Sequence, residues 1–214
     1  MHTPHVDELR SGTMPEGETV NGLKIEGKHL YKRICTEKIY LTKRGLENDR
    51  QPVDHERALF AYPLTHYNYW DENFTKRPID IGALGENLVL SGANEYTTFI
   101  GDTYRFGEAV IQVSQPLFPR LNEHHPFSSE DFIRKMKKTG KTGWFYRVIE
   151  EGYVEGAVEL ELIDRPHPEW SIAAINEAMY VEKENLRLAY ELSQCELLSP
   201  GWRRFFARRL QGLR

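Results

Sequence analysis

A carboxylate and an amide stand side by side at Gly85-Glu86-Asn87, directly before the apolar run Leu88–Leu90, which is typical of a strand. Rigid backbone could hold both side chains at the rim of a pocket, and Gly85 would allow a ligand to approach closely. The same side chains could instead hydrogen bond to backbone amides of their own turn. The local pattern leaves both interpretations open.

A second polar joint, Gln115-Pro116, ends the predicted strand Ala109–Ser114. Proline stops sheet pairing and so could free backbone groups for a ligand. Equally, it could do no more than end the strand. Arg147 lies within another apolar run, Trp144–Ile149. A buried arginine requires a carboxylate or a bound anion as its partner, so Arg147 is a candidate anion-binding residue.

The most basic stretch of the chain runs from Arg134 to Lys141. Gly140 and Gly143 could expose backbone amides beside these cations and form a phosphate site. The GxxxxGK[ST] spacing of a P-loop is absent. The alternative is a solvated helix face.

Metal-ligand residue types gather at Asp54-His55-Glu56-Arg57 and Asn122-Glu123-His124-His125, but neither group has a zinc spacing. Cys35 and Cys195 have no CxxC pattern or neighbouring histidine, and we expect two buried thiols. The sequence therefore predicts neither a metal ligand set nor a nucleophilic cysteine.

The elements that must position these residues are mostly strands. Short apolar runs separated by turns every eight to twelve residues indicate a barrel or sandwich over residues 1–164. A helix is predicted after Pro63, with His66, Tyr67 and Trp70 as core residues. Arg165–Pro168 reads as a rigid linker and domain boundary. Residues 165–214 then predict three helices, over Ile172–Tyr180, Glu182–Gln194 and Gly201–Leu210.

The composition is that of a soluble globular protein, with 40% hydrophobic and 28% charged residues among 214. The net charge of −4 gives no reason to expect nucleic acid or an anionic membrane as a partner. We find no apolar run near the ~18 residues of a membrane helix, and no signal peptide at the start. Two cysteines far apart suit a cytoplasmic location.

Six blocks of the sequence, taken in order, resemble the MOSC-domain proteins of the YiiM type, which carry a C-terminal three-helix domain. The blocks are Arg57–Leu59 with Tyr62-Pro63, His66-Tyr67 and Trp70; Gly82–Leu88; Ile100–Asp102; Ile111–Pro116; Thr139–Trp144 with Tyr146–Val148; and Trp202-Arg203 with Arg209-Leu210. The resemblance covers roughly residues 9–212.

This resemblance implies a MOSC β-barrel, related to the pyruvate kinase barrel, followed by a small helical domain. It also implies a molybdenum cofactor and reduction of N-hydroxylated small molecules at the expense of an electron donor. Pyridoxal phosphate is a second, weaker cofactor expectation. In this interpretation Arg57, Glu86, Asn87, Gln115 and Arg147 line the pocket. The arginines would hold the cofactor phosphate, and the amides would orient the pterin or the substrate.

The chain departs from the family pattern at the residue taken to ligate molybdenum. The family has Arg-x-Pro-Cys after Gln-Pro, whereas this chain has Leu117-Phe118-Pro119-Arg120. Arginine carries the opposite charge to a thiolate and has no lone pair to donate. The family histidine of His-Gly-Gly-x-Asp-Arg is also missing, and His55 stands in a different register. The alternative function is therefore a catalytically silent paralogue that keeps the pocket as an anion- or cofactor-binding module.

Overall fold

The structure is a computed structural model that describes residues 3–13, 19–20, 23–24, 32–49, 54–73, 79–121 and 129–212. The candidate metal-ligand group Asn122–His125 lies outside the described residues.

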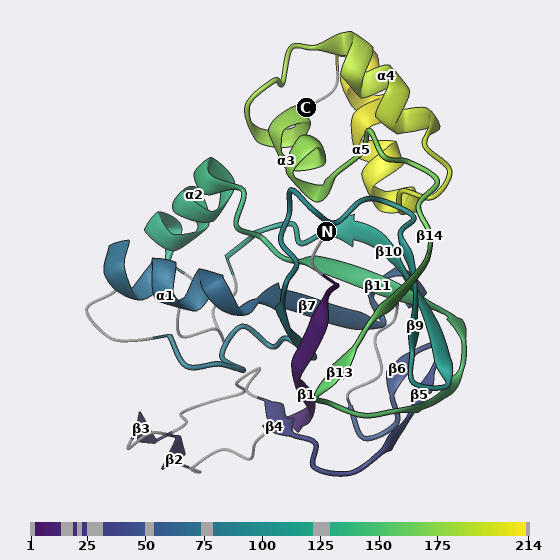
Figure 1. Cartoon of the computed structure of the whole chain (residues 1–214). Coiled ribbons are helices and arrows are strands. Elements are labelled where there is room, and N and C mark those ends of the chain that lie inside the picture. The colour runs from purple at the N-terminus through teal and green to yellow at the C-terminus, as the bar shows by residue number, and fades with distance from the viewer. Residues whose placement is uncertain are drawn as a thin grey trace.

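A nine-stranded sheet forms the body of the molecule (Figure 1). Its strands follow the order β13-β1-β8-β7-β11-β10-β9-β14, and β4 pairs with β1 off this path. Their bounds are β1 His5–Thr13, β4 Lys32–Ile34, β7 Leu59–Pro63, β8 Leu88–Ser91, β9 Thr103–Phe106, β10 Ala109–Pro116, β11 Trp144–Glu150, β13 Val158–Glu159 and β14 Glu161–Asp164. Only the β7–β8 pair is parallel among the pairs of this sheet.

One extended segment joins the two edges of the sheet. Residues 158–159 pair with β1, and residues 161–164 pair with β9 at the opposite end of the strand order. Between them, the amide of Leu160 donates to the carbonyl of Pro4 at 2.8 Å. The same segment thereby covers an edge of β1 and an edge of β9, which curves the sheet into a barrel. The predicted β-barrel is confirmed.

Shorter strands extend this framework. β5 Ile39–Thr42 pairs with β6 Gly45–Leu46 and with β12 Gly152–Val154, and β2 Thr19–Val20 pairs with β3 Leu23–Lys24.

The first helix, α1 Leu64–Asn73, follows β7 directly. Its buried residues are His66, Tyr67 and Trp70, so the prediction that these are core residues is confirmed. Pro63 is the last residue of β7 and stands directly before the first residue of α1. Proline is tolerated at the start of a helix, because an N–H there would have no partner within the helix. The aromatic residues of α1 pack with Phe132 and Met136 of the next helix, α2 Glu130–Thr139, in a cluster separate from the larger barrel core.

Three helices lie together over one end of the barrel (Figure 1). They are α3 Ile172–Tyr180, α4 Leu186–Gln194 and α5 Pro200–Leu210. Ser171 and Ser199 cap α3 and α5 with their side chains. The predicted start of the middle helix at Glu182 is wrong, because Asn185 caps α4 and so fixes its first turn at Leu186. Buried residues of all three helices, such as Ile175, Leu192 and Phe206, belong to the same core cluster as the barrel interior.

Candidate functional site

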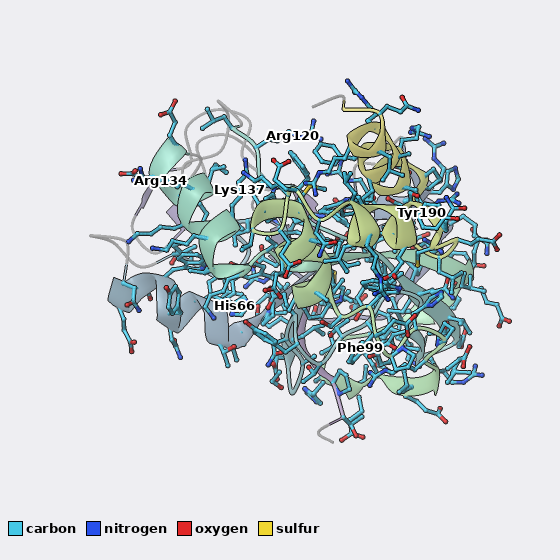
Figure 2. The ribbon with its side chains drawn as sticks, turned by 90° about the horizontal axis from the view of Figure 1, so that it is seen from above. His66, Phe99, Arg120, Arg134, Lys137 and Tyr190 are labelled. Carbon is cyan, nitrogen blue, oxygen red and sulfur yellow. The ribbon has the colours of Figure 1, made fainter. Side chains whose placement is uncertain are left out.

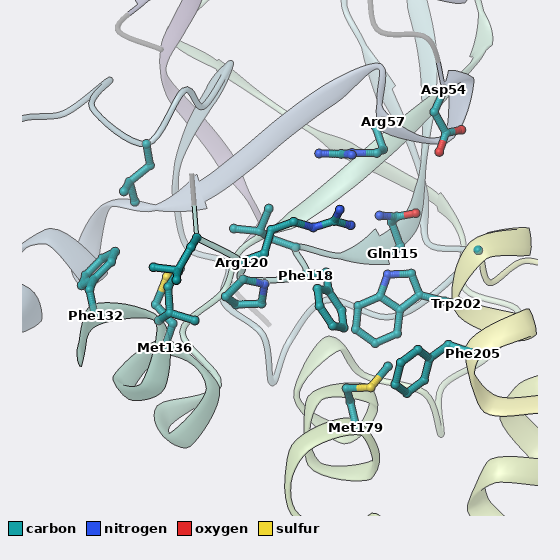
Figure 3. A pocket seen from close by; sticks show the side chains of 16 residues that line it. Asp54, Arg57, Gln115, Phe118, Arg120, Phe132, Met136, Met179, Trp202 and Phe205 are labelled. Atoms are coloured by element: carbon teal, nitrogen blue, oxygen red, sulfur yellow. The ribbon is translucent and has the colours of Figure 1, made fainter. Parts of the chain in front are cut away.

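A cavity of about 560 Å³ lies between the end of the barrel, α2 and the helical domain (Figure 3). The residues that line it are Asp54, Arg57, Leu84, Gln115, Leu117, Phe118, Pro119, Arg120, Leu121, Phe132, Ile133, Met136, Met179, Gly201, Trp202 and Phe205. Of the five residues that the sequence assigned to the cofactor pocket, the structure brings Arg57 and Gln115 here, together with Arg120.

Arg57 ends a short 3₁₀ helix, η1 His55–Arg57, which Asp54 caps by accepting from the amide of Glu56 at 3.0 Å. The guanidinium of Arg57 stacks over the Phe145 ring, 4.6 Å from its centroid. Burial lowers the pKa of Arg57, the positive charge of Arg120 lowers it further, and Asp54 opposes both effects. Arginine nevertheless stays protonated near neutral pH, so Arg57 brings a positive charge to the pocket.

Arg120 follows β10 and lies over the Phe118 ring, with 5.6 Å between its guanidinium carbon and the ring centroid. Figure 3 shows Arg57, Arg120 and Gln115 pointing toward one shared space. In the described part of the chain, neither guanidinium makes a hydrogen bond or an ion pair. Two like charges thus face the same cavity, and no counter-ion from the described residues is bonded to either.

Gln115 is the third polar group of this space. The residue is only 7% exposed, yet its side-chain amide has no hydrogen-bond partner among the residues the structure describes. Figure 3 places this amide above the indole of Trp202. The amide atoms of Gln115 are not sealed away from solvent, because they reach the cavity, and Gln115 is therefore a candidate ligand contact.

Aromatic side chains form the wall toward the helical domain. The ring centroid of Phe118 lies 6.0 Å from that of Trp202, 6.1 Å from Phe205 and 6.3 Å from Tyr180. The ammonium of Lys137 is 5.7 Å from the Phe118 centroid and adds a positive charge at this side. Arg120 and Lys137 both approach the Phe118 ring, and Figure 2 shows them near each other in the view from above. The pocket can therefore accept a flat ring beside an anionic group.

Glu86 does not line this pocket. Its carboxylate is fully buried and accepts hydrogen bonds from the hydroxyl of Tyr67 and the amides of Gly82 and Leu84. Burial raises the pKa of Glu86, and these hydrogen bonds oppose the rise only in part. The structure does not bring Glu86 to this cavity, and its hydrogen bonds to Gly82 and Leu84 match the interpretation in which its side chain holds its own turn.

Asn87 is likewise occupied within the fold. Its side-chain oxygen accepts from the amide of Phe60 at 3.1 Å. Its side-chain nitrogen donates to the carbonyl of Arg10 at 3.1 Å and to the carboxylate of Asp49 at 2.7 Å. Asn87 ties the start of β8 to β7 and β1, and the structure does not bring it to the pocket.

Arg147 has the partners that a buried arginine requires, and they all come from the protein. The guanidinium donates to the carboxylate of Glu56 at 2.8 Å, to the side-chain oxygen of Gln112 at 2.9 Å and to the carbonyl of Leu197 at 2.6 Å. Arg147 is not among the residues that line this cavity, and its donors bond instead to η1, β10 and the helical domain.

The basic stretch from Arg134 to Lys141 does not form a phosphate cradle from backbone amides. The amide of Gly140 donates to Met136, and the amide of Gly143 donates to the carboxylate of Glu95 at 2.8 Å. Arg134 pairs with Asp131 on the exposed side of α2. The solvated-face interpretation describes Arg134 and Lys138, which are exposed, whereas Lys135 donates to the carbonyl of Asn73 and Lys137 and Lys141 lie over aromatic rings.

No group of three or more His, Cys, Asp or Glu that could hold a metal ion occurs within the described ranges. Cys195 is buried and Cys35 is half-buried, and burial raises the pKa of both thiols. Neither cysteine lines the pocket. In the same described ranges, no helix has the length and apolar character that crossing a membrane requires.

Sequence reasoning did not assign the helical wall of the pocket. Met179, Trp202 and Phe205 reach it from α3 and α5, more than 50 residues after Gln115 and Arg120. The one available signal was the Trp202-Arg203 block of the family pattern, which carries no indication that the tryptophan faces the barrel.

Comparisons with known proteins identify both parts of the chain. The MOSC domain family matches residues 32–160, and the YiiM-like, 3-alpha helix domain family matches residues 170–213. The expected boundary between residues 164 and 165 lies in the interval between these matches.

Relatives of known sequence and structure agree. Protein YflK of Bacillus subtilis (strain 168) is 34% identical over 200 residues, covering 91% of this chain and 90% of that protein. A protein of Gibberella moniliformis named Reductase is 31% identical over 172 residues, covering 77% of this chain but 31% of that protein. The crystal structure of YiiM from Geobacillus stearothermophilus superposes with a TM-score of 0.78 at 32% identity, covering 97% of this chain and 99% of YiiM. The chain therefore belongs to the MOSC-domain family and carries the YiiM-like three-helix domain after its barrel.

Proposed function

We propose that the pocket between barrel and helical domain binds an anionic, ring-containing cofactor of the molybdopterin type. The observation that carries this proposal is a pair of guanidinium groups, Arg57 and Arg120, which face a cavity of about 560 Å³ and have no counter-ion bonded to them among the residues that the structure describes. One guanidinium can donate two parallel hydrogen bonds to the oxygens of a phosphate group. Two arginines that face the same cavity are therefore suited to a phosphorylated ligand. Membership of the MOSC family supports the cofactor class.

The remaining lining fits the organic part of such a cofactor. Gln115 offers a free amide that can donate to and accept from a ring edge. Phe118, Trp202 and Phe205 offer apolar surface for a planar ring. The cavity volume also lies within the range of about 300–1,000 Å³ that is usual for small-molecule sites.

A protein sulfur ligand to molybdenum does not fit the pocket. The resemblance puts that ligand at Arg120, which has no lone pair to give, and neither Cys35 nor Cys195 is in the lining. The chain's own residues therefore bind and orient the cofactor, and we assign none of them to a step at the metal. Pyridoxal phosphate fits less well, since no lysine in the described lining could form a Schiff base with it.

A second candidate function is reduction of N-hydroxylated small molecules. It is favoured by the family and by the Gibberella moniliformis relative named Reductase. Such a reduction releases the hydroxyl oxygen as water and takes up two electrons and two protons, so it needs an electron donor. The aromatic wall of Phe118 and Trp202 would hold a flat substrate of this kind.

The test is purification from a host that makes molybdenum cofactor, followed by measurement of molybdenum and pterin per chain. We expect pterin near one equivalent in the unmodified protein and a loss of most of it in Arg57→Gln. Arg134→Gln is the matched control, because Arg134 pairs with Asp131 on the exposed side of α2. Protein free of pterin from such a host would overturn the proposal. Turnover of an N-hydroxylated purine by the loaded protein, with a reductant, would decide the second candidate.

A further inference from the structure

Three side chains of the pocket converge on one point and share one property. Arg57, Gln115 and Arg120 point into the same space (Figure 3), and in the described part of the chain none of them has a hydrogen-bond partner for its side chain. Together they present guanidinium and amide N–H donors and one amide oxygen. A set made almost wholly of donors is complementary to a group made of acceptors.

The charge of this cluster is not balanced by the lining. Asp54 is the one acidic residue among the described lining residues, and one of its carboxylate oxygens already accepts from the amide of Glu56. The pKa of Arg57 is lowered in part by the Arg120 charge, so the two cations are close enough to repel each other. A bound anion between them would relieve this repulsion.

The N-terminus of α5 faces the same cavity. Gly201, the second residue of this eleven-residue helix, lines the pocket, and a Cβ added there would meet no atom within 4 Å. The N-terminus of a helix carries partial positive charge, which favours an anion nearby. In the first turn of α5, Pro200 has no N–H and the amide of Trp202 donates to the side chain of Ser199, so the amide of Gly201 is the one that the described residues leave for a ligand. This adds to the arginine pair and does not by itself define the site.

We infer that Arg57, Gln115 and Arg120 form an oxyanion site that holds the phosphate of a heteroaromatic phosphate monoester without a metal ion. The inference rests on the pocket of the proposed function and says which chemical group lies at Arg120, where the family pattern has a metal-binding cysteine. A guanidinium there attracts phosphate oxygens and offers nothing to a metal centre. The ester's ring lies against Phe118 and Trp202, whose faces flank the cluster.

The experiment uses protein from a host without the molybdenum cofactor pathway, in buffer containing a chelator, so that its outcome does not depend on cofactor loading. The probes are inorganic phosphate, pyridoxine 5′-phosphate and pyridoxine. The affinity of the protein for each probe is measured by isothermal titration calorimetry. We expect pyridoxine 5′-phosphate to bind, inorganic phosphate to bind at least tenfold more weakly, and pyridoxine to show no measurable binding. Equal affinity for inorganic phosphate and pyridoxine 5′-phosphate would contradict the claim that the pocket binds the ring of the ester. Tight binding of pyridoxine would overturn the claim that the phosphate is the group that the site holds.

Three variants decide which residues hold the phosphate. Arg120→Gln should weaken binding of pyridoxine 5′-phosphate by about 10- to 100-fold, which is the usual effect of losing a charge-assisted hydrogen bond. Arg120→Cys should weaken it equally, because a thiol gives no positive charge. Arg134→Gln should change it by less than about twofold, since that residue lies on an exposed helix face. Unchanged affinity in both Arg120 variants, with unfolding temperatures like the unmodified protein, would overturn the site. Pterin retention from a cofactor-making host is a separate measurement, so failure of either proposal can be told from failure of the other.

Discussion

The guanidinium of Arg147, on barrel strand β11, donates a hydrogen bond of 2.6 Å to the carbonyl of Leu197, in the loop between α4 and α5. The same guanidinium holds Glu56, whose neighbour Arg57 faces the pocket. The carbonyl of Ser114, next to Gln115, also accepts from the amide of Ser199 in that loop. The barrel and the helical domain are thus hydrogen bonded to each other next to Arg57 and Gln115, which line the cavity.

Replacing Arg147 should destabilise the fold and not only the pocket. Arg147→Met leaves the Glu56 carboxylate and the Leu197 carbonyl without this donor. The side chains of Arg147 and Glu56 are only 16% and 24% exposed. We expect a loss of about 2–4 kcal/mol in the free energy of unfolding, measured with denaturant. The control is Arg187→Met on α4, whose pair with Glu191 is 86% and 36% exposed, with an expected change below about 0.5 kcal/mol. Similar losses in both variants would contradict the assignment.

Glu86 should make stability depend on pH in a defined direction. Burial raises its pKa in the folded protein above the ordinary value of 4.5, so the folded state binds the proton more tightly than the unfolded state. Its stabilising contribution is fully present below pH 4.5 and is lost as the pH rises through the folded pKa. The stability deficit of Glu86→Gln relative to the unmodified protein should therefore shrink as the pH rises above 4.5. Unfolding curves of both proteins at several pH values test this, and a deficit that grows with pH would sink it.

Gly143 should tolerate no side chain. Its φ is +67°, and an added Cβ would lie 2.4 Å from the carbonyl oxygen of Ala61 and 2.7 Å from a ring carbon of Tyr62. Gly143→Ala should cost at least about 2 kcal/mol, because the backbone must move to admit the methyl group. Gly201→Ala is the matched substitution at an open helical position and should leave the unfolding midpoint unchanged or raise it. A Gly143→Ala protein as stable as Gly201→Ala would disprove the argument.

Phe118 should control how firmly the helical domain is held. Its ring contacts those of Tyr180, Trp202 and Phe205, which all belong to that domain. Phe118→Ala should lower the free energy of unfolding by about 1–3 kcal/mol and speed amide hydrogen exchange in α3 and α5 more than in the barrel strands. Tyr190→Ala, at a ring that is 59% exposed, should have little effect on either measurement. Uniform acceleration across the chain after the Phe118 change would argue against a local role.

Much of the fold could be predicted because its signals are local. The serine caps of α3 and α5 need only the few residues that follow them, and strand runs such as Trp144–Ile149 show their apolar character directly. The start of α4 was misplaced by four residues, since Glu182 and Asn185 both precede an apolar pattern and only the backbone shows which one caps.

The site could be predicted only in part, because its definition depends on partners far away in the sequence. Glu86 and Arg147 carried the right chemistry for a pocket, but the protein itself supplies their partners: Tyr67 for one, Glu56 and Leu197 for the other. A residue type indicates that a partner is needed and does not say whether it is a ligand. The same limit explains why the aromatic wall on α5 was not foreseen.

The segment of residues 158–164 also sets an order of events during synthesis. It supplies the pairing for both β1 and β9, so neither edge of the barrel can be covered until this part of the chain has left the ribosome. Pairing that joins residues 5 and 159 is also highly non-local, and such pairing forms slowly. Nascent chains stalled before residue 158 would therefore leave one edge of β1 and one edge of β9 without a partner, and exposed strand edges are prone to aggregation.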